Sequence, residues 1–331
     1  MMNANRVLLL PCCHRNGRWG YISEEGEWII SPRFVHADPF CEGGTAAVLC
    51  DRQLHLWTLI DQTGSALFVP QRLDLMVALS EDRALAENQN PFVMDGSGCP
   101  FWRPVCSDLQ PAGNGLYVVW NGSRGNSWGS GLLVREGGEP VVSEPFLEVQ
   151  MFPDGRRFLG RREYGYVVMD LDGRVLHRFD RGYDRIDAFD EMGRAVFSRD
   201  GRCGVMREDE TFLVNPQFLE IDFCFGHWGT CVSFRNDPDG VFQIYNALGG
   251  SVLDDSFEYT APAVEQNMFW GEKNGGWSLY RVNGDCLAHD ICTELLPQID
   301  GRYQGVIGDD GEMFYVDAAD GAGMRIVTVR N

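Results

Sequence analysis

The chain has 331 residues, and its 44% hydrophobic and 12% aromatic content is enough to bury a large core. Its formal net charge of −20 is spread along the length and argues against nucleic acid or an anionic membrane as a partner, because phosphate binding requires clustered Lys and Arg. The simplest interpretation is that the negative charge keeps the protein soluble. The alternative is that it attracts a basic protein partner.

The N-terminus carries a short apolar run, residues 7–10, before a proline. It is too short for the apolar region of a secretion signal, so we expect residues 6–10 to form the first strand of the fold. Eleven irregularly spaced cysteines are typical of reduced thiols in a cytoplasmic protein, and no apolar run approaches a membrane-spanning length.

A turn that usually contains glycine recurs at intervals of about 37 residues, which indicates a repeat architecture. Units begin near residues 6, 45, 83, 116, 156, 194, 230, 267 and 302, so a single repeat domain spans residues 1–331. The turn falls at Gly26, Gly64, Gly98, Gly138, Gly173, near Glu210, and at Gly249, Gly284 and Gly321.

Each unit is predicted to contain three strands, because its apolar runs are short and rich in β-branched and aromatic residues. Residues 45–49 are typical of the first strand, 19–23 of the second and 28–31 of the third. The linkers at residues 184–193 and 219–229 hold enough apolar residues for a fourth short strand.

The first unit carries the residues of a known repeat, and two later units keep part of it. The matching positions are Trp19, Gly20, Tyr21, Gly26, Pro32, Phe34, Phe40 and Gly43, then Gly165, Tyr166 and Gly173 in the fifth unit, and Gly204 and Pro216 in the sixth. This pattern resembles the WG-repeat (KWG-repeat) proteins of bacteria. That family is defined by its repeat and has no common reaction, so the resemblance implies a fold and binding roles in the cytoplasm or envelope, not a catalytic site.

Metal chemistry has weak support in the sequence. Cys12, Cys13 and His14 form the densest cluster, but neighbouring residues on a strand point to opposite faces and cannot converge on one ion. Acidic turns such as residues 170–173 lack the later ligands of a calcium loop, and Asp before Gly is what a tight turn requires. We predict no metal, no cofactor and no catalytic residue.

The longest insertion, residues 121–131, lies within the fourth unit. Trp120, Arg124 and Trp128 form a candidate protein-binding loop, since aromatic residues and Arg dominate interface energetics. The alternative is that Trp120 and Trp128 are strand residues that face the core.

The sequence therefore predicts an all-β fold of about nine repeats, each a three- to four-stranded antiparallel meander, arranged as a β-propeller; the alternative is an open β-solenoid or superhelix. The predicted function is a non-catalytic protein-binding scaffold, such as an acidic immunity-type or partner-neutralising protein. The alternative is an enzyme, or a binder of carbohydrate or another small ligand, with its site in a central axial pocket. Carboxylates such as Asp187 and Glu191 converging on one pocket would favour the enzyme.

Overall fold

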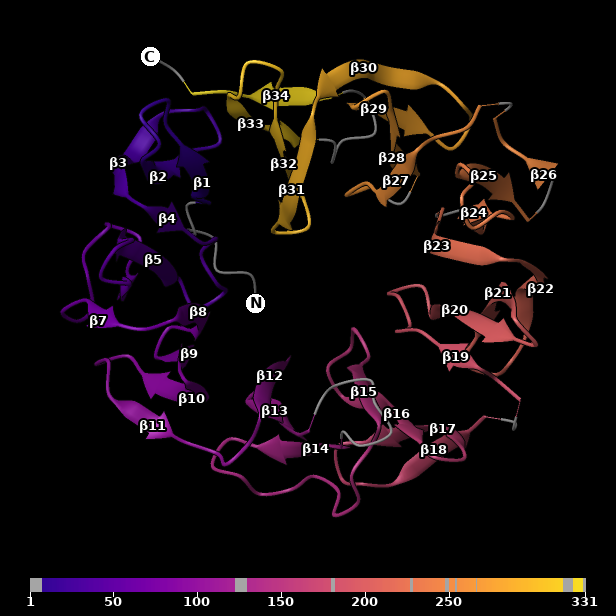
Figure 1. Ribbon diagram of the computed structural model, residues 1–331, viewed down its shortest axis with the longest axis horizontal. Helices are drawn as coiled ribbons and strands as arrows, with labels where there is room; N and C mark the ends of the chain where they lie inside the picture. The colour runs from indigo at the N-terminus through magenta and orange to yellow at the C-terminus, as the bar shows by residue number, and fades with distance from the viewer. Residues whose placement is uncertain are drawn as a thin grey trace.

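The computed structural model describes residues 8–122, 130–179, 182–226, 229–247, 250–253, 255–265, 267–317 and 324–329. These residues form nine antiparallel sheets around a common axis, a nine-bladed β-propeller (Figure 1). The predicted all-β class and ring are confirmed, and the open solenoid is wrong. The regular elements of the described residues are all strands, so none of them is a helix long and apolar enough to cross a membrane.

The blades follow one another in chain order. Blade 1 has β1 (Leu10–Cys13), β2 (Trp19–Ile22) and β3 (Trp28–Phe34). Blade 2 has β4 (His36–Ala37), β5 (Ala46–Asp51), β6 (Leu56–Ile60) and β7 (Gln71–Arg72). Blade 3 has β8 (Leu75–Ser80), β9 (Arg83–Asn88), β10 (Asn90–Asp95) and β11 (Pro100–Trp102). Blade 4 has β12 (Asp108–Gly113), β13 (Leu116–Asn121) and β14 (Ser130–Arg135).

The remaining five blades have four strands each. Blade 5 has β15 (Glu148–Met151), β16 (Arg157–Arg162), β17 (Gly165–Asp170) and β18 (Val175–Arg178). Blade 6 has β19 (Arg185–Ile186), β20 (Arg194–Arg199), β21 (Arg202–Arg207) and β22 (Phe212–Phe218). Blade 7 has β23 (Glu220–Phe225), β24 (Cys231–Arg235), β25 (Gln243–Asn246) and β26 (Gly250–Ser251). Blade 8 has β27 (Tyr259–Pro262), β28 (Met268–Lys273), β29 (Gly276–Arg281) and β30 (Cys286–Cys292), and blade 9 has β31 (Glu294–Ile299), β32 (Tyr303–Ile307), β33 (Met313–Asp317) and β34 (Arg325–Val327).

Blades and sequence repeats are offset from one another. In each four-stranded blade the chain starts at the axis and runs outward, and the innermost strand is the segment predicted as a linker (Figure 1). The fourth strands expected there are present as β19 and β23. The predicted first strand at residues 6–10 agrees with the structure at Leu10, where β1 and its pairing with Ile22 of β2 begin. Leu8 and Leu9 precede the strand, and residues 6 and 7 lie outside the described residues.

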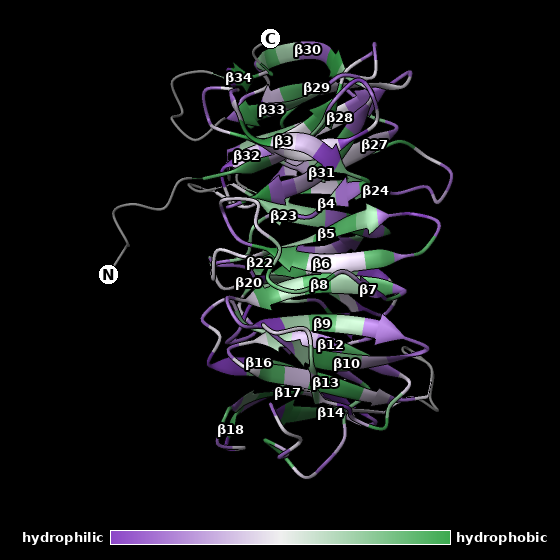
Figure 2. Ribbon diagram, turned by 90° about the vertical axis from the view of Figure 1, so that its left-hand side faces the viewer, coloured by the Kyte–Doolittle hydropathy of each residue, from purple (hydrophilic) through white to green (hydrophobic). Residues whose placement is uncertain are grey.

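The core lies between the blades, which pack face to face. Phe152 and Leu159 of blade 5 share one buried cluster with Ile186, Phe197 and Met206 of blade 6. Seen edge-on, the strands run between the two faces of the ring, and the turns at both faces are mainly hydrophilic or neutral (Figure 2). Each interface therefore buries apolar strand surface that a single blade would leave exposed.

The Trp–Gly step of the repeat faces a bulge in the next strand. Trp19 pairs with Phe34 and Tyr21 with Ile30, so three residues of β3 lie opposite Gly20. A Cβ added to Gly20 would lie 2.4 Å from the carbonyl oxygen of Ile30 and 2.9 Å from the nitrogen of Pro32. Only glycine fits without moving this backbone.

Blades 6 and 8 show how the bulge tolerates other sequences. At Gly204 an added Cβ would lie 2.5 Å from the carbonyl oxygen of Val214, as in blade 1. Blade 8 has Ser278 in this place, and its hydroxyl accepts the backbone N–H of Asp290 at 2.9 Å. Asp290 has a φ of 46°, so the bulge takes a different backbone path around the serine side chain. Gly165 of blade 5 is not under this constraint, since its Cβ would meet nothing within 4 Å.

A second recurring device is an ion pair across the interface between neighbouring blades, which we call the latch. The arginine lies at the start of a blade's second strand, and the glutamate lies two residues before the turn glycine, or its equivalent, in the next blade. The pairs are Arg83–Glu136 at 2.7 Å, Arg157–Glu208 at 2.7 Å and Arg302–Glu24 at 2.9 Å.

The Arg302–Glu24 latch joins blade 9 to blade 1 and so closes the ring. Arg302 also donates to Asp317 at 2.7 Å, and the Tyr315 hydroxyl donates to the carbonyl oxygen of Pro11. Leu10, Cys12, Ile22, Ile299, Tyr303, Met313, Tyr315 and Val327 form the buried cluster at this junction. In its ion pair and its apolar cluster, closure therefore repeats contacts made between other blades.

The bulge predicts a stability difference between two glycines. Gly20→Ala should lower the free energy of unfolding by about 3 kcal/mol, because backbone atoms must move to admit a methyl group. Gly17→Ala is the control: Gly17 has a φ of 76° and open space around it, so only backbone strain of about 1–2 kcal/mol is expected. Thermal melting of the two variants measures the difference. Equal losses would contradict the steric account.

The latch predicts that ring closure depends on Arg302. Arg302→Met keeps the aliphatic stem but leaves Asp317, which is 7% exposed, without this ion pair. The loss should be about 1–2 kcal/mol, less than for a fully buried pair because the guanidinium is partly exposed. Arg15→Met is the control, since its pair with Glu312 is exposed and should contribute less than about 0.5 kcal/mol. Chemical denaturation should rank the two variants in this order.

Candidate functional site

The predicted binding loop is only partly described. Trp120 lies on β13, is 4% exposed and belongs to the core cluster between blades 4 and 5. Its proposed role as an exposed contact is therefore wrong, because its indole ring packs in the core with Leu133, Phe146 and neighbouring residues. Arg124 and Trp128 lie outside the described residues.

The residues of the WG motif lie mainly inside the scaffold. Tyr21 is fully buried and donates its hydroxyl to the carbonyl oxygen of Asp38 at 2.7 Å. Trp19 is half-buried, contacts the clusters on both sides of blade 1, and its ring centroid lies 5.3 Å from that of His36. An added Cβ at Gly43 would lie 2.0 Å from the backbone nitrogen of Glu81 in blade 3. These positions hold blades together and bring no reactive groups to one place.

The other residues of the repeat motif have the same structural character. Gly26 and Gly173 have φ values of 83° and 82° in the recurring turn, and Glu210 takes a φ of 63° at the equivalent place. Its carboxylate accepts hydrogen bonds from the Tyr183 hydroxyl at 3.0 Å and contacts His177 of blade 5 at 3.2 Å. Phe34, Tyr166 and Phe218 are buried, Phe40 is half-buried, and Pro32 and Pro216 lie in the bulges.

Carboxylates gather on the strands nearest the axis, a feature that the sequence analysis did not identify as a group. Each innermost strand of blades 2 to 9 carries at least one acidic residue within it or directly beside its end, and the basic residues in these eight segments are His36 and Arg185. The innermost strand of blade 1, β1, has no acidic residue in these positions. We call this set the axial carboxylates: Asp38, Asp74, Glu81, Asp108, Glu148, Asp184, Asp187, Glu220, Asp222, Glu258, Glu294 and Asp300. The sequence does hold a signal for part of this set: an acidic residue stands at a fixed distance after a phenylalanine of the outermost strand, as in Phe34 to Asp38 and Phe218 to Asp222.

Two axial carboxylates have perturbed protonation. Removal from water raises the pKa of Asp187; the ion pair with Arg185 at 2.9 Å opposes this shift, and Glu148 of blade 5 adds to it. Removal from water likewise raises the pKa of Asp222, although Thr260 of blade 8 donates a hydrogen bond to it at 3.2 Å. Both groups therefore lose hydration in the inner wall of the ring without gaining full compensation.

The carboxylates named in the enzyme alternative do not share a described pocket. Asp187 follows β19, whereas Glu191 is exposed in the turn before β20. Among the described residues, pockets lie between blades 7 and 8, between blades 9 and 1, and between blades 5 and 6, and neither carboxylate lines any of these.

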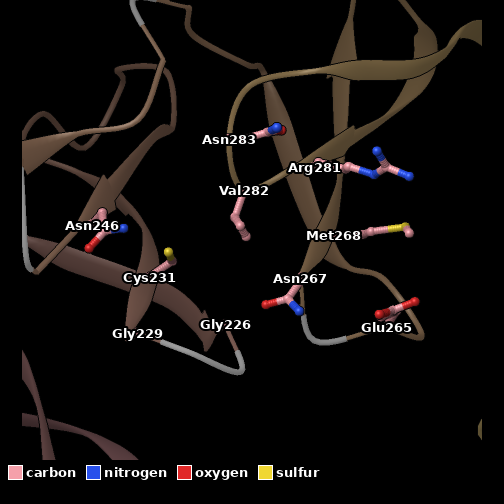
Figure 3. A pocket seen from close by; sticks show the side chains of 10 residues that line it. All are labelled: Gly226, Gly229, Cys231, Asn246, Glu265, Asn267, Met268, Arg281, Val282 and Asn283. Atoms are coloured by element: carbon pink, nitrogen blue, oxygen red, sulfur yellow. The ribbon is translucent and has the colours of Figure 1, made fainter. Parts of the chain in front are cut away.

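The pocket between blades 7 and 8 has a volume of about 450 Å³ (Figure 3). Gly226, Gly229, Cys231 and Asn246 line it from blade 7, and Glu265, Asn267, Met268, Arg281, Val282 and Asn283 line it from blade 8. Burial raises the pKa of Cys231 to about 11, so its thiol is neutral at pH 7 and a poor nucleophile.

The cysteines and acidic turns serve local structure. Cys12 is buried and Cys13 half-buried on β1, and burial raises the pKa of Cys12. The Asp170 carboxylate accepts backbone N–H groups of Asp172 at 3.0 Å and Arg174 at 2.8 Å, which stabilises the turn. No group of three or more His, Cys, Asp or Glu suited to a metal ion occurs within the described ranges.

The comparisons with known proteins agree with the repeat and the fold. A family model described as "WG containing repeat" matches residues 19–52, which cover the later part of the first repeat unit and the start of the second. No curated protein matches the sequence.

Solved structures resemble the chain at low sequence identity. A crystal structure of the eukaryotic initiation factor has a TM-score of 0.53 at 9% identity, covering 87% of this chain and 89% of the other. BamB from Moraxella catarrhalis has a TM-score of 0.39 at 13% identity, with 83% and 82% covered. Kluyveromyces lactis Hsv2p has a TM-score of 0.37 at 10% identity, with 66% and 76% covered. The first likeness shows the fold alone.

The raised pKa of Asp222 predicts a pH-dependent stability effect. A carboxyl whose pKa is higher in the folded protein stabilises the fold when protonated, and this contribution is lost as pH rises from its ordinary value of 3.8 through the raised value. Asp222→Asn should therefore raise the melting temperature at pH 7 and leave it nearly unchanged below pH ~3.5. Asp172→Asn, in an exposed turn, is the control. A lower melting temperature at pH 7 would contradict the assignment.

Proposed function

We propose that this protein is a non-catalytic scaffold that binds, and thereby neutralises, a basic protein partner. The observation that carries the proposal is the placement of the axial carboxylates on or beside the innermost strands of blades 2 to 9. Attraction by a concave acidic surface increases the association rate of a positively charged partner. An immunity-type role against a basic toxin is the concrete form of this proposal.

The energetics of Asp187 and Asp222 support binding over solubility alone. Both carry raised pKa values, so their ionised forms destabilise the folded state. Charges at exposed positions on the outside of the ring would make the protein equally soluble, so solubility does not explain charges at poorly hydrated positions. Groups that lower stability are typical of functional surfaces. A cytoplasmic location remains part of this proposal.

The experiment compares two triple variants with equal change in charge. The axial variant is Asp187→Asn, Glu220→Gln and Asp222→Asn, and the control is Glu139→Gln, Asp172→Asn and Asp285→Asn at turn positions. Partners captured by the wild-type protein are identified, and their association rates are measured at increasing salt. We expect a basic partner whose association slows steeply with salt and at least 10-fold in the axial variant alone. An acidic partner, or equal effects of both variants, would contradict the proposal.

A further inference from the structure

The hairpin between β28 and β29 turns through an asparagine followed by a glycine. Lys273 pairs with Gly276, which leaves a two-residue turn between the strands. Asn274 and Gly275 occupy this turn with φ values of 53° and 83°, and both residues are exposed. Glycine has no side chain, so its backbone nitrogen can approach the side-chain carbonyl group of the preceding asparagine without steric hindrance.

A buried carboxylate contacts the nitrogen of this turn. Glu272 is 6% exposed, and its Oε1 atom accepts the backbone N–H of Gly275 at 2.5 Å. The Oε2 atom of Glu272 is buried and has no hydrogen-bond partner within the described ranges. The neighbouring cation, Lys273, is paired with Asp255. The carboxylate is therefore placed to take a proton from the Gly275 nitrogen.

We propose that Asn274 is a site of spontaneous deamidation, with Glu272 as the general base. Glu272 takes the proton of the Gly275 N–H, and the nitrogen attacks the Cγ atom of Asn274 after a rotation about ψ of that residue. The new C–N bond closes a succinimide ring. The bond between Cγ and Nδ2 breaks, the proton passes from Glu272 to the leaving nitrogen, and ammonia departs.

Water completes the reaction, and the exposed turn admits it. Addition of water to one ring carbonyl gives aspartate, and addition to the other gives isoaspartate, in which the backbone runs through Cγ. Either product places a further negative charge beside Glu272 and Glu258, which accepts the backbone N–H of Asn274 at 3.2 Å. Isoaspartate also lengthens the two-residue turn by one backbone atom, so both products should weaken the hairpin of blade 8.

The chain contains a matched control for this reaction. Asn114 and Gly115 form the turn between β12 and β13, with φ values of 53° and 70°. The Nδ2 atom of Asn114 donates to the carbonyl oxygen of Gly155 in blade 5 at 3.2 Å, which restrains the amide. Among the described residues, no carboxylate accepts the N–H of Gly115. The two sites therefore share sequence and turn, and only Asn274 has a base.

Peptide mass spectrometry of the folded protein, incubated in water labelled with heavy oxygen, measures the rate at each site. We expect Asn274 to deamidate at least 10-fold faster than Asn114 near pH ~7. Glu272→Gln should slow the reaction at Asn274 about 10-fold. Asp285→Asn removes an exposed carboxylate from another turn of blade 8 and should leave the rate unchanged.

The pH dependence tests the base without a variant and decides the case if Glu272→Gln does not fold. The rate at Asn114 should rise about 10-fold per pH unit between pH ~6 and ~8, because hydroxide must remove the proton there. The rate at Asn274 should rise less than about 3-fold per pH unit, since Glu272 replaces hydroxide. Equal rates at the two sites, parallel pH profiles or an unchanged rate in Glu272→Gln would overturn the inference.

Discussion

The ring is held together by contact between the faces of neighbouring blades. Each described sheet consists of strands consecutive in the chain, so no strand from one end of the sequence completes a sheet at the other. Closure therefore relies on side chains: the Arg302–Glu24 latch, the Tyr315–Pro11 hydrogen bond and the shared apolar cluster. Because the ion pair and the apolar cluster repeat contacts of internal interfaces, a high blade number is compatible with a closed ring.

The repeat motif is explained by this packing and by local backbone geometry. Gly20 and Gly204 are needed where an outer-strand bulge approaches the Trp–Gly step, and Gly43 where two blades approach closely. Ser278 shows that the motif can change when the opposing backbone changes with it. The most recognisable residues of the sequence therefore specify the scaffold, and residues with a function are to be sought at positions that the motif leaves free.

The fold could be predicted from the sequence because period and strand chemistry are local signals. The described glycine turns and the fourth strands at β19 and β23 follow from them, whereas the same signals are compatible with either a ring or an open solenoid. Of the predicted turn glycines, Gly249 and Gly321 lie outside the described residues. The site could not be predicted in the same way. Trp120 is apolar and next to a long insertion, and only its packing in the core separates a buried ring from an exposed one. Asp187, Asp222 and their counterparts gather because their strands lie at the axis. The innermost strand can be identified only when the offset between sequence repeat and blade is known.

The distribution of charge separates the axis from the rest of the surface. Acidic residues in the turns form hydrogen bonds that lower their pKa, as at Asp95, where the Ser97 hydroxyl and the Cys99 backbone N–H donate to the carboxylate. Such groups stabilise the fold when ionised. At the axis the pKa values of Asp187 and Asp222 are instead raised, because lost hydration and neighbouring carboxylates oppose their ionisation. A cationic group bound at the axis would compensate these two carboxylates for their lost hydration. A basic partner that binds there should therefore be retained and should also stabilise the ring.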